Sequence, residues 1–169
     1  MLSRPWLLGF LEAQGSFSIV FKKIPSGLGY QVIPDFSVKV PLAQVSLLEA
    51  IQQELRIGHI YRTATGATLK ATKLADAQDL IAFLEGQRFL SETRQRHFDA
   101  WKESVRLITQ GTHRTKEGLL NLAMHRDLLT ERKQHQHDYC HVRRDLDPCE
   151  HAKHGTLPKT CRRCHTQEK

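Results

Sequence analysis

Cysteine and histidine side chains gather near the C-terminus, and their spacing predicts a zinc site. All four cysteines of the 169-residue chain lie in its last thirty positions. Two residues separate Cys161 from Cys164, which is the spacing of one half of a zinc knuckle. A Cys₄ or Cys₃His site fits best, formed by the pair with two further ligands from Cys140, Cys149, His151 and His154.

A segment of about 30 residues cannot bury a core, so a bound metal would have to supply its folding free energy. Two alternatives stay open: a disordered basic tail with free thiols, or a pair of disulfides. We therefore divide the chain into a domain over residues 1–134 and a Cys/His-rich, zinc-binding tail over residues 135–169. Arginines around the cysteines would suit an additional phosphate or minor-groove contact: Arg143, Arg144, Arg162 and Arg163.

The charge balance favours a polyanionic partner. The chain has 25 Lys and Arg against 18 Asp and Glu, a formal net charge of +7, and a pI near 9.4. Nucleic acid is the first candidate, because every phosphate that is neutralised releases counterions. The alternative is a merely soluble basic protein.

The apolar stretches predict a core rather than a membrane segment. None approaches the roughly 20 residues that span a bilayer. The apolar stretch over residues 1–11 leads directly into Glu12 and Gly15, so we interpret it as a core helix of a cytoplasmic protein. Asn occurs once and Arg is at least as common as Lys, which favours a prokaryotic or phage source over an A/T-rich organelle genome.

Apolar periodicity predicts an α+β fold. The order is helix, strand, strand, helix, strand, strand, helix, followed by more helices. Pro34 indicates that the second strand is an edge or carries a bulge. We expect one antiparallel sheet with helices on one face. The predicted strands cover residues 16–22, 30–40, 59–63 and 68–72.

The first helix carries a motif of a known family. Leu7-Leu8-Gly9-Phe10-Leu11-Glu12-Ala13-Gln14-Gly15 resembles the nine-residue LAGLIDADG motif, and Ser16-Phe17 then begins a strand as in that family. Residues 33–38 resemble the family's second strand, and residues 112–119 resemble the start of its late helix. Over about residues 3–130 the chain is therefore similar to single-motif LAGLIDADG homing endonucleases.

That resemblance implies an αββαββα fold with a saddle-shaped antiparallel sheet, followed by C-terminal helices and, in this chain, the Cys/His tail. It also implies a site-specific double-strand DNA endonuclease of intron or intein homing. The enzyme would act as a homodimer on a long, pseudo-palindromic site. Small or compact residues at helical spacing would let two first helices approach closely, and the expected interface is Leu8, Gly9, Glu12 and Ala13.

The acidic position of the motif is changed in this chain. In the family the eighth position is an Asp or Glu that binds a divalent cation, and Gln14 stands there. The resemblance places the Mg²⁺ site (Ca²⁺ or Mn²⁺ as substitutes) at Ala13 and Gln14, and places Arg94 near the scissile phosphate as a second catalytic residue. A Gln amide offers an oxygen without charge, whereas Mg²⁺ prefers anionic oxygen ligands. Glu12 points about 200° away around the helix and is a poor substitute.

Three interpretations of Gln14 stay open. It is an active-site substitution made to trap an uncut complex, a natural loss of cleavage in a protein that still binds DNA or RNA, or part of an unusual active enzyme. We rank them in that order.

Strand alternation predicts which residues would contact DNA. A saddle-shaped sheet can enter the major groove, where base edges carry a distinct donor and acceptor pattern. The face opposite the core would present Ser18, Val20, Lys22, Gln31, Ile33, Asp35, Ser37, Lys39, Arg62, Thr68, Lys70 and Thr72. Phosphate contacts are expected from Lys23, Arg94 and Arg96.

Two other function classes compete with the endonuclease. One is a nucleic-acid-binding protein without catalysis, either an RNA partner of the maturase kind or a DNA-binding regulator. The other is a small basic α+β protein with a zinc tail and no nuclease ancestry. A homologue with Asp or Glu at the position of Gln14 would distinguish the endonuclease from both of these other classes.

We predict one zinc ion per chain, bound through Cys161 and Cys164. Elemental analysis after purification under reducing conditions should find it, and the double variant Cys161→Ser, Cys164→Ser should lose it. A chelator should unfold the tail and leave the sheet intact, because the main domain has its own core. Zinc-free protein, or a Cys161–Cys164 disulfide mapped in fresh protein, would contradict this prediction.

Overall fold

The computed structural model describes residues 2–129 together with residues 142 and 146. The sheet contains β1 (Gly15–Lys23), β2 (Tyr30–Pro41), β3 (His59–Arg62) and β4 (Gly66–Ala71). The helices are α1 (Arg4–Gln14), α2 (Val45–Leu55), α3 (Leu74–Leu84), α4 (Glu92–Thr109) and α5 (Lys116–Leu129). The order αββαββα followed by further helices confirms the predicted fold class.

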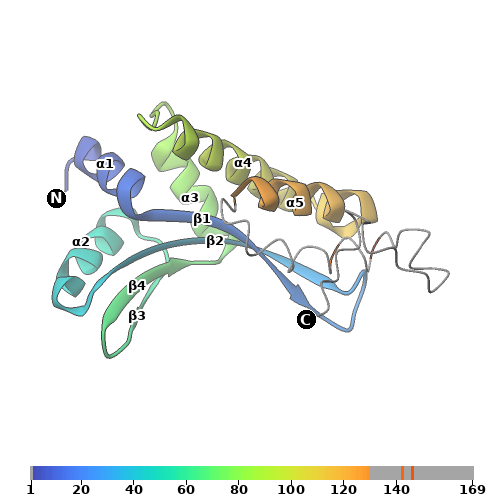
Figure 1. The fold of residues 1–169 in the computed structure, drawn as a ribbon, viewed down its shortest axis with the longest axis horizontal. Helices are drawn as coiled ribbons and strands as arrows, with labels where there is room; N and C mark the ends of the chain where they lie inside the picture. Colours follow the sequence, from blue (N-terminus) through green and yellow to red (C-terminus); the bar gives the residue numbers. More distant parts are fainter. Residues whose placement is uncertain (1, 130–141, 143–145, 147–169) are drawn as a thin grey trace, which may run out of the picture.

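The sheet is antiparallel throughout, with strand order β1-β2-β4-β3. In Figure 1 it is seen nearly edge on and arches like a saddle. Helices α1, α4 and α5 pack against β1, α3 against β2, and α2 against β4, and all lie on the outer side of the arch. No helix in the described part of the chain lies beneath the arch, so no described helix covers the second face of the sheet, which we call the open face.

Strand β2 has two neighbours along only part of its length. It pairs with β1 from Tyr30 to Val38, whereas its pairing with β4 begins at Phe36. Pro34 lies opposite Ile19, in the section where β4 is not yet paired. Its missing N–H therefore costs no ladder hydrogen bond to β4. The expectation of an edge strand is wrong for β2 as a whole and right for the section around Pro34.

An aromatic cluster around Phe17 joins β1 to the helix layer. The Phe17 ring lies 5.2–5.5 Å, between centroids, from the rings of Phe36, Phe98 and Trp101, and 6.2 Å from the ring of Phe89. The indole Nε1 of Trp101 donates a hydrogen bond to the backbone oxygen of Ser18, at 3.2 Å. Aromatic pairs at these separations stabilise a core beyond their buried area, so this cluster fixes α4 against β1.

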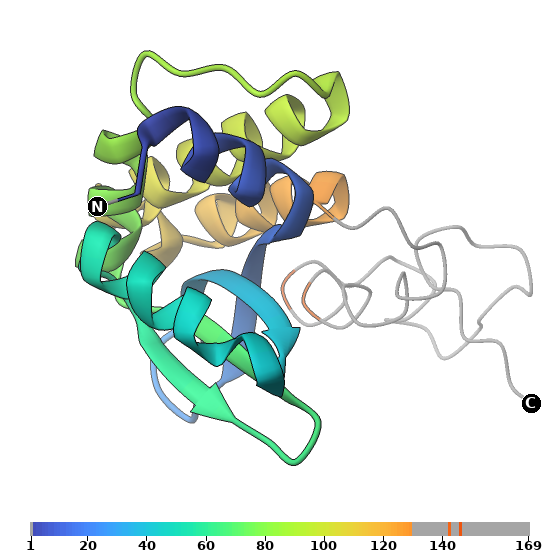
Figure 2. The same ribbon diagram turned by 90° about the vertical axis from the view of Figure 1, so that its left-hand side faces the viewer.

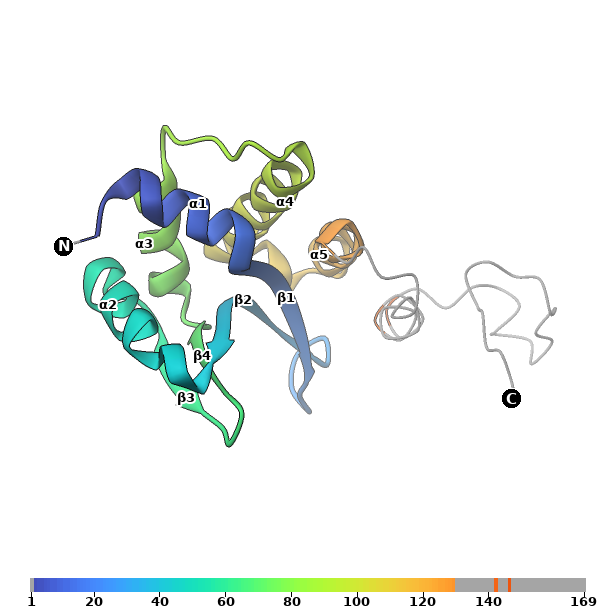
Figure 3. The same ribbon diagram turned by 60° about the vertical axis from the view of Figure 1, so that its left-hand side comes forward.

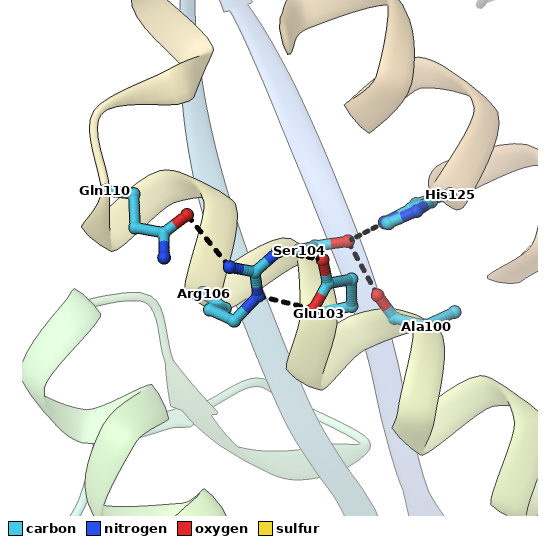
Figure 4. Close-up of polar contacts among 6 residues, drawn as sticks. All are labelled: Ala100, Glu103, Ser104, Arg106, Gln110 and His125. Atoms are coloured by element: carbon cyan, nitrogen blue, oxygen red, sulfur yellow. Dashed lines mark hydrogen bonds and ion pairs between the residues drawn. The ribbon is translucent and has the colours of Figure 1, made fainter.

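Helix α5 is held on α4 by a buried serine (Figure 4). The Ser104 hydroxyl donates to the backbone oxygen of Ala100 at 2.7 Å and lies 3.0 Å from Nδ1 of His125. Because the hydroxyl proton is used on Ala100, Nδ1 of His125 is the donor of the second bond. The neighbouring Glu103–Arg106 ion pair is exposed, and its hydrogen bonds lower the pKa of Glu103.

The cysteines lie outside the described residues, so the zinc site at Cys140, Cys149, Cys161 and Cys164 stays a prediction, as does the boundary at residue 134. Of the tail, Val142 and Leu146 are described, and both belong to or pack against the hydrophobic core. Within the described part of the chain, no helix has the length and apolar character needed to cross a membrane.

We predict that Gly118→Ala destabilises the fold. A Cβ at Gly118 would lie 1.9 Å from the backbone oxygen of Thr112, because α5 packs directly on the turn before it. Backbone cannot move aside as a side-chain end can, so the loss should be about 2–3 kcal/mol in chemical denaturation. Met124→Ala, an exposed change in the same helix, should stay within about 0.5 kcal/mol. Equal unfolding midpoints for the two variants would contradict this packing.

Candidate functional site

Helix α1 has one buried and one uncovered side. Leu7 and Leu11 are fully buried, whereas Trp6 is 42% exposed and stacks on Phe10 with ring centroids 5.2 Å apart. Gly9 is exposed, and a Cβ built there would meet no atom within 4 Å. Figures 2 and 3 show α1 at the near surface of the molecule, with no described element in front of it. A second helix therefore has access to this side of α1.

The motif's acidic end lies where α1 passes into β1. Ala13 and Gln14 are exposed at the last turn, and β1 begins at the next residue, Gly15. A Cβ at Gly15 would lie 2.4 Å from the backbone oxygen of Leu11, so only glycine allows this direct passage from helix to strand. The side chain of Gln14 is thus held at the junction between the helix layer and the sheet.

Glu12 is engaged with its own chain. Its carboxylate accepts hydrogen bonds from the backbone N–H of Ser91 at 2.6 Å and of Leu90 at 3.1 Å, in the loop before α4. The acid therefore anchors that loop beside α1, and Figure 2 shows the loop passing alongside the helix. Glu12 was expected at a dimer interface, but these bonds direct its carboxylate to the α3–α4 loop.

A hollow beside the end of α1 brings Arg94 to the motif. It is lined by Glu12 and by residues around the start of α4: Ser91, Thr93, Arg94 and His97. The Ser91 hydroxyl caps α4 by accepting from the backbone N–H of Arg94. The sequence pattern selected Arg94 but missed Thr93 and His97. His97 lies three residues after Arg94 and four after Thr93, and this helical spacing was the signal that could have found it.

The described residues of one chain do not form a site for a divalent cation. Gln14 offers a neutral amide oxygen, and the nearest motif acid, Glu12, accepts two backbone N–H groups. No group of three or more His, Cys, Asp or Glu side chains with metal-binding geometry occurs in the described part of the chain. Hard cations such as Mg²⁺ prefer anionic oxygen ligands, so the expected metal at Ala13 and Gln14 does not fit this donor set.

The open face of the sheet carries polar and basic side chains. The helix-covered face buries Phe17, Ile19, Phe36, Val38 and Leu69, and the alternate positions point the other way. We define the open face by Ser18, Val20, Lys22, Gln31, Ile33, Asp35, Ser37, Lys39, His59, Tyr61, Thr68 and Lys70. It therefore presents hydrogen-bonding groups on all four strands and lysines on β1, β2 and β4.

The expectation that Arg62 lies on this face is wrong. Arg62 pairs with the buried Ala67 in the β3–β4 register and therefore lies on the helix-covered side, where it forms an ion pair with Glu49 of α2. His59 and Tyr61 take the open-face positions of β3, opposite Lys70 and Thr68. The apolar Ile60 between them was the sequence signal for the correct face. An apolar residue belongs on the helix-covered face, and Arg62, two positions later, must share that face.

Three further predicted residues lie outside the open face. Thr72 follows the end of β4 and is exposed. Lys23 ends β1 opposite Tyr30 and places its ammonium 5.9 Å from that ring centroid. Arg96 is exposed on α4, where it donates to the Thr93 hydroxyl. None of them contributes to the central part of the open face.

The family model described as LAGLIDADG endonuclease matches residues 7–105. A probable intron-encoded endonuclease from Neurospora crassa is 29% identical over 120 residues, which cover 68% of this chain but 22% of that relative's length. The chain thus spans less than a quarter of this curated relative.

Solved structures share the architecture. An archaeal intron-encoded homing endonuclease complexed with DNA is 28% identical, with a TM-score of 0.74 over 85% of this chain and 94% of its own. The endonuclease I-SmaMI, bound to an uncleaved DNA target in the presence of calcium ions, has a TM-score of 0.73 at 18% identity, over 82% of this chain and 49% of its own. The family model matches more than half of the sequence across the α1 motif and the sheet, and the chain belongs to the LAGLIDADG endonuclease family.

Proposed function

We propose that the chain binds a long, site-specific DNA duplex as a homodimer and that, with Gln14 in place of the motif acid, it cuts that duplex poorly or not at all. The observation that carries the proposal is the open face: one side of a saddle-shaped sheet, uncovered by any described helix, with hydrogen-bonding and basic side chains on every strand. The related archaeal endonuclease was solved with DNA.

The physical basis is the fit of a curved sheet to the major groove. That groove admits extended strands and presents a distinct donor and acceptor pattern for each base pair. Half-buried polar groups such as Ser37 and Thr68 are suited to base edges, whereas exposed cations such as Lys22 and Lys39 are suited to phosphates. Arg94, in the hollow beside α1, would neutralise the phosphate at the centre of the site.

The uncovered side of α1 supports the homodimer. Gly9 has open space around its Cα, so a second α1 could approach closely there, and Trp6 offers an exposed aromatic surface. A two-fold axis between two α1 helices would bring both Gln14 side chains to the axis. It would also place two open faces along one duplex, which matches a pseudo-palindromic target.

The chemistry at Gln14 supports weak cleavage. Phosphodiester hydrolysis needs charge neutralisation and an activated water, which carboxylate-bound divalent cations supply when present. In a homodimer both acids are replaced together. The relative I-SmaMI was solved with calcium ions and uncleaved DNA, whereas the donor set at the end of α1 here is neutral.

A binding protein without catalysis is the second candidate, and the neutral Gln14 favours it. The partner would then be DNA or, as for intron maturases, RNA. A-form RNA has a deep, narrow major groove that protein elements cannot enter. Competition between duplex DNA and duplex RNA of equal length therefore separates these two partners, and the open face predicts a preference for DNA.

We predict that Gln14→Glu restores cleavage. A carboxylate at this position would supply the anionic metal ligand that each protomer lacks, so the rate with Mg²⁺ should rise by at least about 100-fold. The measurement is cleavage of a randomised duplex library by the two proteins side by side. Gln14→Leu should bind DNA and stay inactive. Equal cleavage rates for the parent chain and Gln14→Glu would contradict the proposed role of this position.

We also predict that Gly9→Leu weakens the dimer while leaving the monomer folded. Outside the nearby backbone of α1 itself, no atom of the described residues lies within 4 Å of a Cβ at Gly9, so a partner helix would be what Leu pushes away. Sedimentation should show a dimer dissociation constant at least about 10-fold higher, with a parallel loss of DNA affinity. Ala75→Leu, an exposed enlargement on α3, is the matched control and should change neither. An unchanged dimer in Gly9→Leu would exclude this interface.

A further inference from the structure

Asp35 is a buried carboxylate on the open face. Asp35 is 8% exposed, although no described helix covers this face of the sheet. Oδ2 accepts a hydrogen bond from the Ser18 hydroxyl at 3.2 Å, across the β1–β2 pair. Oδ1 is buried without a hydrogen-bond partner. A buried charged group is costly unless it is paired, so this one needs a physical explanation.

The cation that faces Asp35 is Lys70. Its Nζ lies 3.4 Å from Oδ1 of Asp35, which makes an ion pair without the geometry of a hydrogen bond. Lys70 lies opposite Ser37 in the β2–β4 register, one step along the open face from Asp35, and opposite His59 on its other side. The Lys70 side chain is 42% exposed, so its ammonium contacts the buried carboxylate and is still accessible to a ligand bound on the open face.

The polar groups thus form one row across the sheet. Ser18 of β1 lies opposite Asp35 of β2, Asp35 meets Lys70 of β4 diagonally, and Lys70 lies opposite His59 of β3. Of the two cations in the middle of the open face of β2 and β4, Lys70 has a carboxylate partner, whereas Lys39 has no ion pair among the described residues. The two lysines therefore differ in how firmly their ammonium groups are held.

We propose that Asp35 is a positioning residue for base recognition: its carboxylate holds Lys70 at the centre of the open face, where the ammonium donates to a guanine edge in each half-site instead of to a phosphate. The inference rests on the proposed DNA binding. Guanine O6 and N7 are the major-groove acceptors that Lys recognises. The negative charge of Asp35 also keeps phosphates away from this position, so the pair contributes to specificity more than to overall affinity.

Asp35→Asn separates positioning from packing. The amide preserves size and can still accept from Ser18, but it no longer holds the ammonium. Lys70 then becomes free to reach a phosphate. The variant should lose preference for one guanine per half-site, from about 10-fold to below about 3-fold. Its binding to unrelated duplexes should be stronger, with a log–log salt slope steeper by about 0.9 for each Lys70.

The experiment selects bound duplexes from a randomised library and then measures affinity at several salt concentrations for the parent chain and five variants. Asp79→Asn, on exposed α3, controls for the gain of one unit of net charge and should leave base preference unchanged. Lys39→Met should weaken binding to all sequences and leave the base profile intact. Lys70→Met should lose the same guanine preference as Asp35→Asn, and the double variant Asp35→Asn, Lys70→Met should match Lys70→Met alone.

The results of these variants distinguish a positioning role of Asp35 from direct base contact and from no role. Loss of one guanine preference in both single variants, with no further loss in the double variant, supports the positioning role. A base profile that Asp35→Asn leaves unchanged overturns it. So does a change in profile that Asp35→Asn still produces when Lys70 is already Met, because Asp35 would then contact a base directly. A folded parent chain that binds no duplex at all contradicts the proposed DNA binding itself.

Discussion

The aromatic contacts of Phe17 are the interaction on which the rest of the structure depends. This ring meets Phe36 within the sheet, Trp101 and Phe98 on α4, and Phe89 in the loop before α4. Phe17 is also the third residue of β1, which continues directly from α1. The cluster therefore fixes α1, the sheet and the start of α4 relative to one another. Glu12 and Arg94 line one hollow because of that arrangement, and Glu12 reinforces it by holding the same loop.

One-sided burial divides the protein into a structural half and a binding half. Every helix in the described part of the chain lies on the outer side of the arch, so the helix-covered face of the sheet is apolar and the opposite face is free to carry polar groups. Helix α1 repeats this division, with Leu7 and Leu11 inside and Gly9 uncovered. Cations on the open face are held to different degrees: Lys70 by a buried acid, Lys39 by none among the described residues. A surface of this kind can separate base recognition from phosphate attraction.

The sequence predicted the long elements well because their periodicity is unambiguous. Nine residues of β1 and twelve of β2 alternate clearly, so the faces of Ser18, Gln31 and Lys39 followed. Strand β3 has four residues, which is too short for charge alone to fix the alternation, and Arg62 was assigned to the wrong face. The bonds from Glu12 to Leu90 and Ser91 join residues almost eighty positions apart, and no local pattern reveals them. The burial of Asp35 and its pairing with Lys70 likewise depend on a register that the sequence does not specify.

We propose that two copies of the open face lie in the major groove of one duplex. Guanine N7 methylation interference on a duplex selected by the protein tests it most directly, because N7 lies in the major groove. We expect two protomers per duplex and two symmetrical groups of interfering guanines, one in each half-site. Binding of one protomer, or methylation that has no effect on binding in either half-site, would contradict it.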